Sequence, residues 1–455
     1  MYCGNCFRDN ALVKALRQLG HQVQLVPIYL PLTLEDEDQS AGTPLFFSGI
    51  NVYLEQKSAL FRSAPDWFHN LLSSRRLLKW AAGKAAKTRA EDLGELTLSM
   101  LLGEEGNQAR ELEDLIRWLK TQPKPDVICL SNALLVGQVR GLKADLDAPV
   151  VCTLQGEDSF LDALPESHRA LCWKTLAERA AEIDLFIAPS RYFADLMQKR
   201  LQISAERIRV VYNGINLAGY SDQWRVTRDA APPQSAPPSS PDTRHSSPVL
   251  GYFARLCREK GLDTLVEAFI LLRQSSQPAL KSLRLRIGGS CGPADESFVA
   301  SLRQRLAAAG VLEAVEFCPN LDRANKLDFL HSLSVFSVPA NYGEAFGLYV
   351  IEAMAAGVPV VQPRTASFPE LIEATGGGLL CEPAQPKPLA QAIEELLLNP
   401  EKAQALGAAG RRAVFEKFSA AEMAKATLEV YEEALQKSEI RRPKSEPSPN
   451  DLIRN

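Results

Sequence analysis

Two glutamates eight residues apart, Glu344 and Glu352, have the type and spacing to do chemistry. Apolar residues recur at helical spacing after Gly347 and end at a Gly-Val-Pro turn, which predicts Glu344 on a loop and Glu352 on a helix. The free amides at that helix start, near Phe346, Gly347 and Leu348, suit a phosphate. A carboxylate repels phosphate, so the glutamates are better suited to sugar hydroxyls. The stretch predicts a ligand with both groups, such as a nucleotide sugar; the alternative is an amphipathic helix with two solvated glutamates.

Two cations form a second candidate set. Arg255 follows the apolar run 249–253, which reads as a strand, and Lys260 lies five residues later, before a helix. Ligands of open α/β sheets bind at the carboxyl ends of the strands, and two fixed cations there could hold a pyrophosphate. Arg258 is expected to face solvent. The alternative for all three is a solvated basic loop.

Residues 339–363 resemble the E-x7-E signature of retaining family-4 glycosyltransferases of the GT-B fold, usually close to E-G-F-G-L-x-x-x-E-A-M-A-x-G-x-P-V-V. Ala345 replaces the usual glycine, and residues 254–265 resemble the family motif R-L-x-x-x-K-G-x-x-x-L. The resemblance implies that Glu344 meets the transferred sugar and Glu352 meets the ribose. It also implies that the two cations, with the helix-start amides, neutralise the leaving nucleoside diphosphate without a metal.

The nucleoside side is expected at the next strands. Gly288 and Gly289 follow a strand but lack the G-x-G-x-x-G pattern, and they resemble the strand-G-x-G loop of the family beside the nucleoside. Residues 317–321 occupy the place of the family segment F-x-G-x-V, with Leu321 on the donor side. Pro319 replaces glycine there, which removes a donor and fixes φ, so the nucleobase stays open.

The N-terminal half carries the expected acceptor side. Residues 153–158 resemble the family segment T-x-H-G-x-D near the reacting sugar, with Gln155 in place of histidine. An amide can donate to a sugar hydroxyl but cannot take a proton. Transfer by front-face attack needs no enzyme base, because the leaving phosphate can take the proton of the acceptor. Asp158 is either an acceptor-side ligand or a helix N-cap, and Gly4 and Asn5 stand where relatives place a Gly-rich loop. Segments 188–190 and 211–216 are expected to be structural turns at the rim of the cleft.

Metal chemistry is not favoured, and we expect neither a metal nor a cofactor. Cys3 and Cys6 form a C-x-x-C motif without further ligands at zinc spacing and without the preceding strand of a redox motif. Asp145 and Asp147 form a D-x-D, the metal motif of the other large glycosyltransferase fold, but here they precede a strand as a natural turn. The five histidines are scattered without ligand spacing.

Composition excludes some partners. The 455 residues are 46% apolar and 23% charged, an ordinary soluble mixture, and the net charge of −4 does not suggest nucleic acid. The apolar runs are too short to span a bilayer. Nine cysteines, several inside apolar strands, read as reduced thiols. We expect a cytoplasmic protein with a carbohydrate or glycolipid acceptor, and peripheral contact with a membrane stays open.

Strand and helix patterns alternate along the chain, which predicts parallel sheets covered by helices. The fold class is therefore α/β, of GT-B type, with two Rossmann-like doubly wound domains facing a cleft. The expected parts are an acceptor-side domain at 1–216 with a helical insertion near 58–120, a disordered Pro/Ser-rich linker at 217–248, a nucleotide-sugar-binding domain at 249–418, a closing helix at 419–436 that packs back toward the N-terminal domain, and a disordered tail at 437–455.

The start of the chain departs from that pattern. A helix is predicted at 7–19, a strand at 22–28 and a hairpin at 43–54, so the first strand of the N-terminal domain is missing. Without a central strand the sheet would expose unpaired backbone edges. We therefore expect Met1 to be an internal residue of a longer protein, or a segment of 29–60 to fill the place.

These patterns together predict a glycosyltransferase that moves a sugar from a nucleotide-sugar donor with retention at the anomeric carbon. A glucan-elongating enzyme is one alternative, because residues 49–54 resemble glycogen and starch synthases. A non-catalytic nucleotide-sugar-binding protein is the other, favoured by Gln155 and the missing strand.

Overall fold

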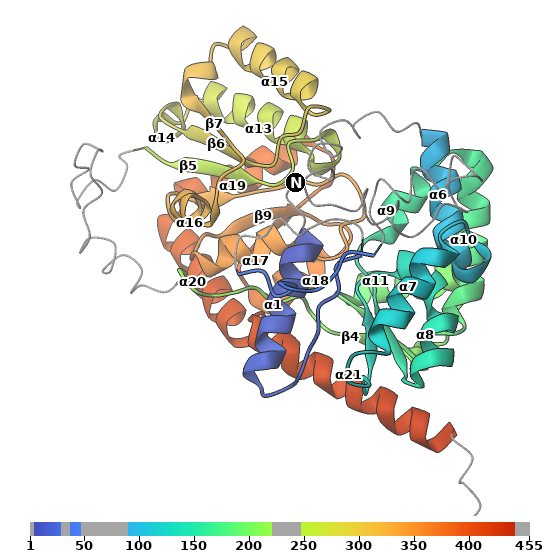
Figure 1. Ribbon diagram of the computed structural model, residues 1–455. Helices are drawn as coiled ribbons and strands as arrows, with labels where there is room; N and C mark the ends of the chain where they lie inside the picture. Colours follow the sequence, from blue (N-terminus) through green and yellow to red (C-terminus); the bar gives the residue numbers. More distant parts are fainter. Residues whose placement is uncertain (1–3, 29–36, 47–89, 221–246, 442–455) are drawn as a thin grey trace, which may run out of the picture.

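The structure is a computed structural model that describes residues 4–28, 37–46, 90–220 and 247–441. It contains two parallel sheets flanked by helices (Figure 1). The first sheet has the order β1-β2-β3-β4, formed by Ile128–Leu130, Val150–Thr153, Leu185–Ala188 and Ile208–Val210. The second has the order β10-β9-β8-β5-β6-β7, formed by β5 Val249–Phe253, β6 Arg284–Gly289, β7 Val315–Pro319, β8 Val335–Phe336, β9 Val360–Pro363 and β10 Gly378–Cys381. Two Rossmann-like α/β units are confirmed.

Helices flank both sheets. In the first unit they are α1 Gly4–Gln18, α6 Ala90–Leu102, α7 Ala109–Leu119, α8 Val139–Leu146, α9 Glu157–Asp162, α10 Glu166–Ala180 and α11 Arg191–Leu201, with 3₁₀ turns at Gly103–Glu105, Ala133–Gln138 and Ala205–Arg207. In the second they are α13 Leu262–Gln274, α14 Pro278–Lys281, α15 Glu296–Ala308, α16 Arg323–His331, α17 Leu348–Ala355, α18 Phe368–Thr375, α19 Pro386–Leu398 and α20 Pro400–Lys417, with 3₁₀ turns at Arg258–Lys260 and Leu312–Ala314.

The strand order of the second sheet determines where its ligand site lies. The order reverses between β5 and β8, which pair in parallel through Leu250 with Val335 and Gly251 with Phe336. Helices that follow neighbouring strands on the two sides of such a reversal leave a crevice at the carboxyl ends of the strands. The loops that leave β5 and β8 therefore meet at this crevice.

The last helix returns to the first sheet. Helix α21, Ala420–Arg441, leaves the second unit and packs beside α1 under the N-terminal sheet (Figure 1). Leu12 and Leu16 of α1 are buried together with Val151, Leu185 and several α21 side chains in one apolar cluster. The apolar face of α1 is thus covered. Helix α21 extends five residues past the predicted end at 436, so 437–441 are helical and not part of a disordered tail.

Several predicted elements differ in the structure. Helix α1 begins at Gly4 rather than residue 7, and 22–28 is not a strand. In that segment the Val23 carbonyl accepts hydrogen bonds from Nε and Nη2 of Arg17, at 3.0 and 2.7 Å, instead of joining a ladder. In the described part of the chain, no strand precedes β1.

Other predicted segments fall wholly or partly outside the described residues. Residues 47–89 include most of the predicted hairpin and half of the predicted helical insertion, and 221–246 include most of the predicted linker. At the start of that linker, Tyr220 is 1% exposed and belongs to the apolar core of the second unit.

The two units are joined by the carboxylate of Glu370, on α18 of the second unit. It accepts hydrogen bonds from the backbone N–H of Arg191, at 3.0 and 2.9 Å, and of Tyr192, at 3.3 Å, in the first turn of α11. The Tyr212 hydroxyl donates a further bond at 2.8 Å. Burial and this carboxylate raise the pKa of Tyr212 to about 12, so the hydroxyl stays protonated. A negative charge at a helix N-terminus is stabilised by the helix dipole and the free amides.

We expect Glu370→Ala to lower the free energy of unfolding by about 2 kcal/mol, because a buried charged acceptor for three donors is lost. Urea unfolding measures the change. Glu373→Ala is the matched control, since Glu373 lies on the same helix with its side chain 80% exposed. Equal effects of the two substitutions would contradict the joining role of Glu370.

Candidate active site

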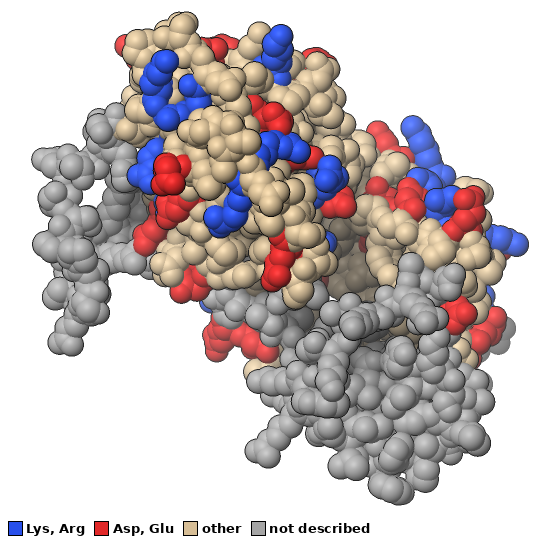
Figure 2. Space-filling model, turned by 90° about the horizontal axis from the view of Figure 1, so that it is seen from above, with Lys and Arg blue, Asp and Glu red and all other residues tan. Residues whose placement is uncertain are grey.

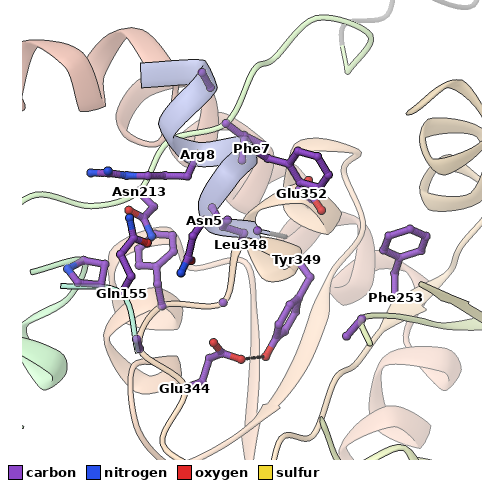
Figure 3. A pocket seen from close by; sticks show the side chains of 18 of the residues that line it. Asn5, Phe7, Arg8, Gln155, Asn213, Phe253, Glu344, Leu348, Tyr349 and Glu352 are labelled. Atoms are coloured by element: carbon purple, nitrogen blue, oxygen red, sulfur yellow. Dashed lines mark hydrogen bonds between the residues drawn. The ribbon is translucent and has the colours of Figure 1, made fainter. Parts of the chain in front are cut away.

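A cavity of about 310 Å³ lies where the two units face each other. Its lining comes mainly from α1 and the loops after β2, β3 and β4 of the first unit, and from the loops after β5, β6 and β8 and the starts of α16 and α17 of the second (Figure 3). The predicted site residues that line it are Gly4, Asn5, Gln155, Arg255, Lys260, Glu344, Phe346, Gly347, Leu348 and Glu352. Those that do not line it are Asp158, Gly288, Gly289 and Leu321.

Backbone contacts bring the loop after β5 against the loop after β8. Gly261 has a φ of +70°, and a Cβ there would lie 1.9 Å from the Pro339 carbonyl oxygen, so only glycine permits this approach. The backbone N–H of Asn341 donates to the Glu259 carbonyl at 3.0 Å. Its side-chain Nδ2 donates to the Arg258 carbonyl at 3.2 Å. These contacts place Lys260 directly beside the second loop.

Glu344 is the centre of the resulting polar cluster. Its Oε2 atom accepts hydrogen bonds from Lys260 Nζ at 2.5 Å, Tyr342 Oη at 2.8 Å and Tyr349 Oη at 2.7 Å (Figure 3 shows the last). The Lys260 ammonium also donates to the Tyr342 hydroxyl and lies 4.8 and 5.0 Å from the centres of the two tyrosine rings. The sequence predicted neither tyrosine as a site residue, because nothing in their spacing distinguishes them from core aromatics.

The charges in this cluster are held in defined states. Burial by itself would raise the pKa of Glu344, but the Lys260 charge and the three hydrogen bonds hold it below its usual value. Burial and the Glu344 charge raise the pKa of both Tyr342 and Tyr349. Glu344 is therefore ionised at neutral pH, and the tyrosines remain hydrogen-bond donors.

The start of α17 supplies backbone donors to the same cavity. Gly347 is its N-cap, with a φ of +93° that favours glycine, and Gly347 and Leu348 line the cavity. The first amides of a helix have no partner within it, so they can bind an anion. Phe346 is 2% exposed and packs with Tyr212 and Phe418, which leaves its backbone rather than its ring for a ligand.

Glu352 is paired with a buried lysine from another helix. Lys326 Nζ of α16 lies 2.9 Å from Glu352 Oε1, and the Lys326 side chain is 1% exposed. This pair orients the carboxylate at the wall of the cavity. Sequence analysis missed Lys326, although it stands three and four residues before Phe329 and Leu330 on the apolar face of α16. A lysine at that position of an apolar face indicates a buried cation.

Arg255 lies at the exposed side of the cavity. Its guanidinium contacts Asp295 at 3.2 and 3.1 Å and is 58% exposed. The hydrogen bond to Asp295 raises the pKa of Arg255. Arg258 is 70% exposed, with its guanidinium 3.5 Å from Asp263. Arg255 and Lys260 thus both line the cavity, whereas Arg258 faces solvent, as the sequence predicted.

The loop after β2 is held from below by Glu157. This buried carboxylate accepts N–H bonds from Ala133 at 2.8 Å, Gln155 at 2.8 Å and Gly156 at 3.0 Å, and burial raises its pKa. The loop thereby presents the Gln155 side chain to the cavity, with its Nε2 3.5 Å from Asp9 Oδ1. The N-cap alternative for Asp158 is wrong, because α9 begins at Glu157 and Gly156 is its N-cap.

Sequence analysis also missed part of the first unit. Arg8 lines the cavity, and so do Asn213 and Asn216 in a segment predicted to be only a structural turn. Arg8 precedes Leu12 and Leu16 by four and eight residues, on the buried face of α1. A charged residue in an apolar stripe is the signal that could have identified it.

The predicted D-x-D motif lies away from this cavity. Asp145 pairs with Lys120 at 2.5 Å and Asp147 with Lys124 at 3.0 Å, and neither aspartate is part of the lining. Among the described residues, no three His, Cys, Asp or Glu side chains are grouped to hold a metal ion. Cys3 lies outside the described residues, and Cys6 is in the first turn of α1.

The surface shows mixed charge. On the face drawn in Figure 2, basic and acidic side chains of the described residues are interspersed. None of the helices searched, all within the described ranges, combines the length and apolar character needed to cross a membrane.

Two facing Rossmann-like units, with paired glutamates and a lysine at the strand-order reversal, define the class of GT-B glycosyltransferases. The chain belongs to family 4 of this class: residues 238–413 match the model "Glycosyl transferases group 1", and residues 97–218 match "Glycosyltransferase Family 4".

Curated relatives are similar over parts of their length. An alpha-maltose-1-phosphate synthase of Mycolicibacterium smegmatis is 29% identical over 246 residues, 52% of this chain and 59% of that protein. A glycogen synthase of Mycobacterium tuberculosis is 27% identical over 315 residues, 68% of this chain and 69% of that protein. A GDP-mannose-dependent alpha-(1-6)-phosphatidylinositol monomannoside mannosyltransferase of the same organism is 32% identical over 171 residues, 36% and 42% of the two chains.

Solved structures share the fold. Anabaena HepE in complex with UDP has a TM-score of 0.59 at 18% identity, over 90% of this chain and all of that one. Sucrose-phosphate synthase from Thermosynechococcus elongatus has a TM-score of 0.58 at 22% identity, over 72% and 79% of the chains. At these identities the likeness establishes the GT-B fold.

We expect Lys260→Met to reverse the pH dependence that Glu344 gives to stability. In the wild-type chain the folded pKa of Glu344 lies below the ordinary 4.5. Ionised Glu344 therefore stabilises the fold above that pH, and this contribution is lost as pH falls through the folded pKa. Without the Lys260 charge, burial raises the folded pKa, so ionised Glu344 destabilises the fold and protonation at lower pH relieves the cost.

Urea unfolding at about pH 7 and about pH 4 measures the contribution of Glu344 to the free energy of unfolding. Each protein is compared with its own Glu344→Gln derivative. We define the difference as the free energy of unfolding of the protein with Glu344 minus that of its Gln derivative. This difference should become smaller at about pH 4 for the wild type and larger at about pH 4 for Lys260→Met. The same direction in both pairs would show that Lys260 does not control this carboxylate.

Proposed function

We propose that this chain transfers a glycosyl group from a nucleotide-sugar donor to a carbohydrate or glycolipid acceptor, with retention of anomeric configuration and without a metal. The observation that carries the proposal is the Lys260–Glu344 pair beside the start of α17, at the strand-order reversal and facing the first unit across the cavity. The proposed setting is the cytoplasm, with peripheral membrane contact if the acceptor is a glycolipid.

The donor diphosphate binds at the start of α17. Lysine has three N–H donors, and Lys260 uses two of them on Glu344 and the Tyr342 hydroxyl. The third remains for a phosphate oxygen, together with the backbone amides near Leu348 and the guanidinium of Arg255. Such fixed donors stabilise charge that develops on a leaving diphosphate.

The two glutamates bind hydroxyl groups. Three hydrogen bonds occupy Oε2 of Glu344, which leaves Oε1 for a hydroxyl of the transferred sugar. Glu352, oriented by Lys326, accepts from the ribose. A carboxylate neutralised by an adjacent lysine tolerates a nearby phosphate, because the pair has little net charge.

Transfer follows from this arrangement. The acceptor hydroxyl attacks the anomeric carbon on the face that the diphosphate leaves, so one carbon–oxygen bond forms as the other breaks. The acceptor proton passes to the leaving phosphate oxygen, and Gln155 donates a hydrogen bond to a sugar hydroxyl without taking a proton. No enzyme base is required.

A glucan-elongating reaction is the second candidate. It is favoured by the similarity to a glycogen synthase over 315 residues. Residues 49–54, which suggested this alternative from sequence, lie outside the described residues. UDP and GDP sugars are the first donors to test, since HepE was solved with UDP and one relative is named as GDP-mannose-dependent.

Donor hydrolysis tests the enzyme directly. A panel of UDP and GDP sugars is screened by thermal shift, and release of nucleoside diphosphate is then measured with and without EDTA. Turnover that EDTA leaves intact is expected. Nucleotide-sugar binding without any turnover would favour the non-catalytic alternative, and a rate restored only by Mn²⁺ or Mg²⁺ would reopen the question of metal.

We expect Lys260→Ala and Arg255→Ala each to cost about 2–4 kcal/mol in kcat/KM, the range for loss of a donor that stabilises developing charge. Arg258→Ala is the matched control, because it removes an exposed cation from the same segment. Wild-type rates in Lys260→Ala and Arg255→Ala would show that these cations do not bind the donor diphosphate.

Substitution of the two glutamates should have different effects on nucleotide binding and on turnover. Glu352→Gln should weaken nucleoside diphosphate binding, because the ribose loses a charged acceptor. Glu344→Gln should lower kcat more than it weakens nucleotide binding, since its partner is the transferred sugar. Calorimetry with the free nucleotide measures the binding affinity, and steady-state kinetics with the sugar donor measure kcat. The opposite pattern would show that the roles are exchanged.

A further inference from the structure

Arg8 is a buried cation on the wall of the cavity that the proposed donor site does not use. It is 2% exposed, it lines the cavity, and it extends from α1 toward Asn213 above Gln155 (Figure 3). Its Nη1 donates to Asp9 Oδ1 at 2.6 Å. In the described part of the chain, neither its Nε nor its Nη2 has a hydrogen-bond partner.

Unpaired donors on a buried guanidinium are costly, so their orientation indicates an absent binding partner. The guanidinium fork matches two oxygens of a phosphate. The surroundings suit the same ligand: α1 begins at Gly4, which lines the cavity, and the start of a helix carries the positive end of the helix dipole. The neutral amides of Asn5, Asn213 and Gln155 line the same region and add hydrogen-bond capacity without negative charge.

The carboxylates nearby do not cancel this attraction. Asp9 takes one donor of Arg8, and burial raises the pKa of Asp9, which disfavours its charged form. Glu344 and Glu352 belong to the second unit, and each lies within hydrogen-bond distance of a lysine. Arg8 and the start of α1 thus line the same wall of the cavity, and Nε and Nη2 of Arg8 are buried within that wall.

We propose that Arg8, the first turn of α1 and Asn213 form an anion-binding subsite that takes a phosphate group of the acceptor. The proposal rests on the proposed function and deepens it, since it makes the acceptor a phosphorylated sugar. The donor diphosphate lies on α17 of the second unit, and the acceptor phosphate lies on α1 across the cavity. A donor diphosphate is the other source of the same chemistry, and the test separates the two.

The test is calorimetric titration of inorganic phosphate into the full chain saturated with UDP or GDP, whichever binds. Phosphate should bind to the nucleotide complex, and Arg8→Gln should weaken it by about tenfold or more, the scale of one charge-assisted fork. Arg8→Lys keeps the charge but loses the fork, and should also bind phosphate more weakly. Lys14→Ala, a cation on the same helix outside the cavity lining, is the control and should bind as the wild type does.

Three results would overturn the subsite: no phosphate binding by the wild type with or without nucleotide, wild-type affinity in both Arg8 variants, or phosphate binding by the free chain that is lost once the chain is saturated with nucleotide. The last would assign Arg8 to the donor diphosphate. Circular dichroism and thermal unfolding establish whether each variant is folded. If Arg8→Gln does not fold, the phosphate affinity of Arg8→Lys alone tests the subsite.

Failure of the proposed function is recognised separately. If the proposed function is wrong, the wild type neither binds nucleotide nor hydrolyses donor. Phosphate is then titrated into the nucleotide-free chain, and that titration alone tests the subsite. In an active enzyme, a sugar monophosphate should be used at least about tenfold better than the same sugar without phosphate. Equal use of the two would overturn the acceptor assignment.

Discussion

The carboxylate of Glu370, inserted at the first turn of α11, is the contact on which the geometry of the cavity depends. It comes from the second unit and accepts backbone N–H bonds from the first. Next to it, Ser190 caps α11 by accepting from the Phe193 amide and donates to the Ala345 carbonyl, at 2.7 Å. Ala345 directly follows Glu344, so the same junction ties the Glu344 loop of the second unit to the first. The return of α21 beneath the first sheet reinforces this arrangement.

Around the cavity, charges occur as pairs of opposite sign. Lys260 pairs with Glu344, Lys326 with Glu352, Arg255 with Asp295 and Arg8 with Asp9. Buried ion pairs are poor sources of stability, because desolvation offsets their attraction. Their value here is orientation: each carboxylate is held in one position. In the proposed site, Lys260 and Arg8 use their remaining N–H donors on a ligand. A site built in this way can hold phosphates and hydroxyls side by side, as a nucleotide sugar requires.

The replacement of histidine by Gln155 fits the same electrostatics. The Gln155 amide lies within 3.5 Å of Asp9, which is itself bound to Arg8. The first unit thus presents amides and a guanidinium to the cavity, and all of these are donors. In the proposed reaction such a wall orients the acceptor, and the leaving phosphate takes the proton.

The sequence by itself determined the elements that short-range patterns encode. Helix α17 after Gly347, the loop position of Glu344 and the strand before Arg255 follow from apolar periodicity and from glycine at a positive φ, both local properties. Only the tertiary structure decided which distant residues meet: Lys326 with Glu352, 26 positions apart, Gln155 with Asp9, 146 apart, and Arg191 with Glu370, 179 apart. It also decided that 22–28 is not a strand and that the Phe346 ring belongs to the core. These outcomes depend on strand order and on the packing of one unit against the other, and no local pattern carries that information.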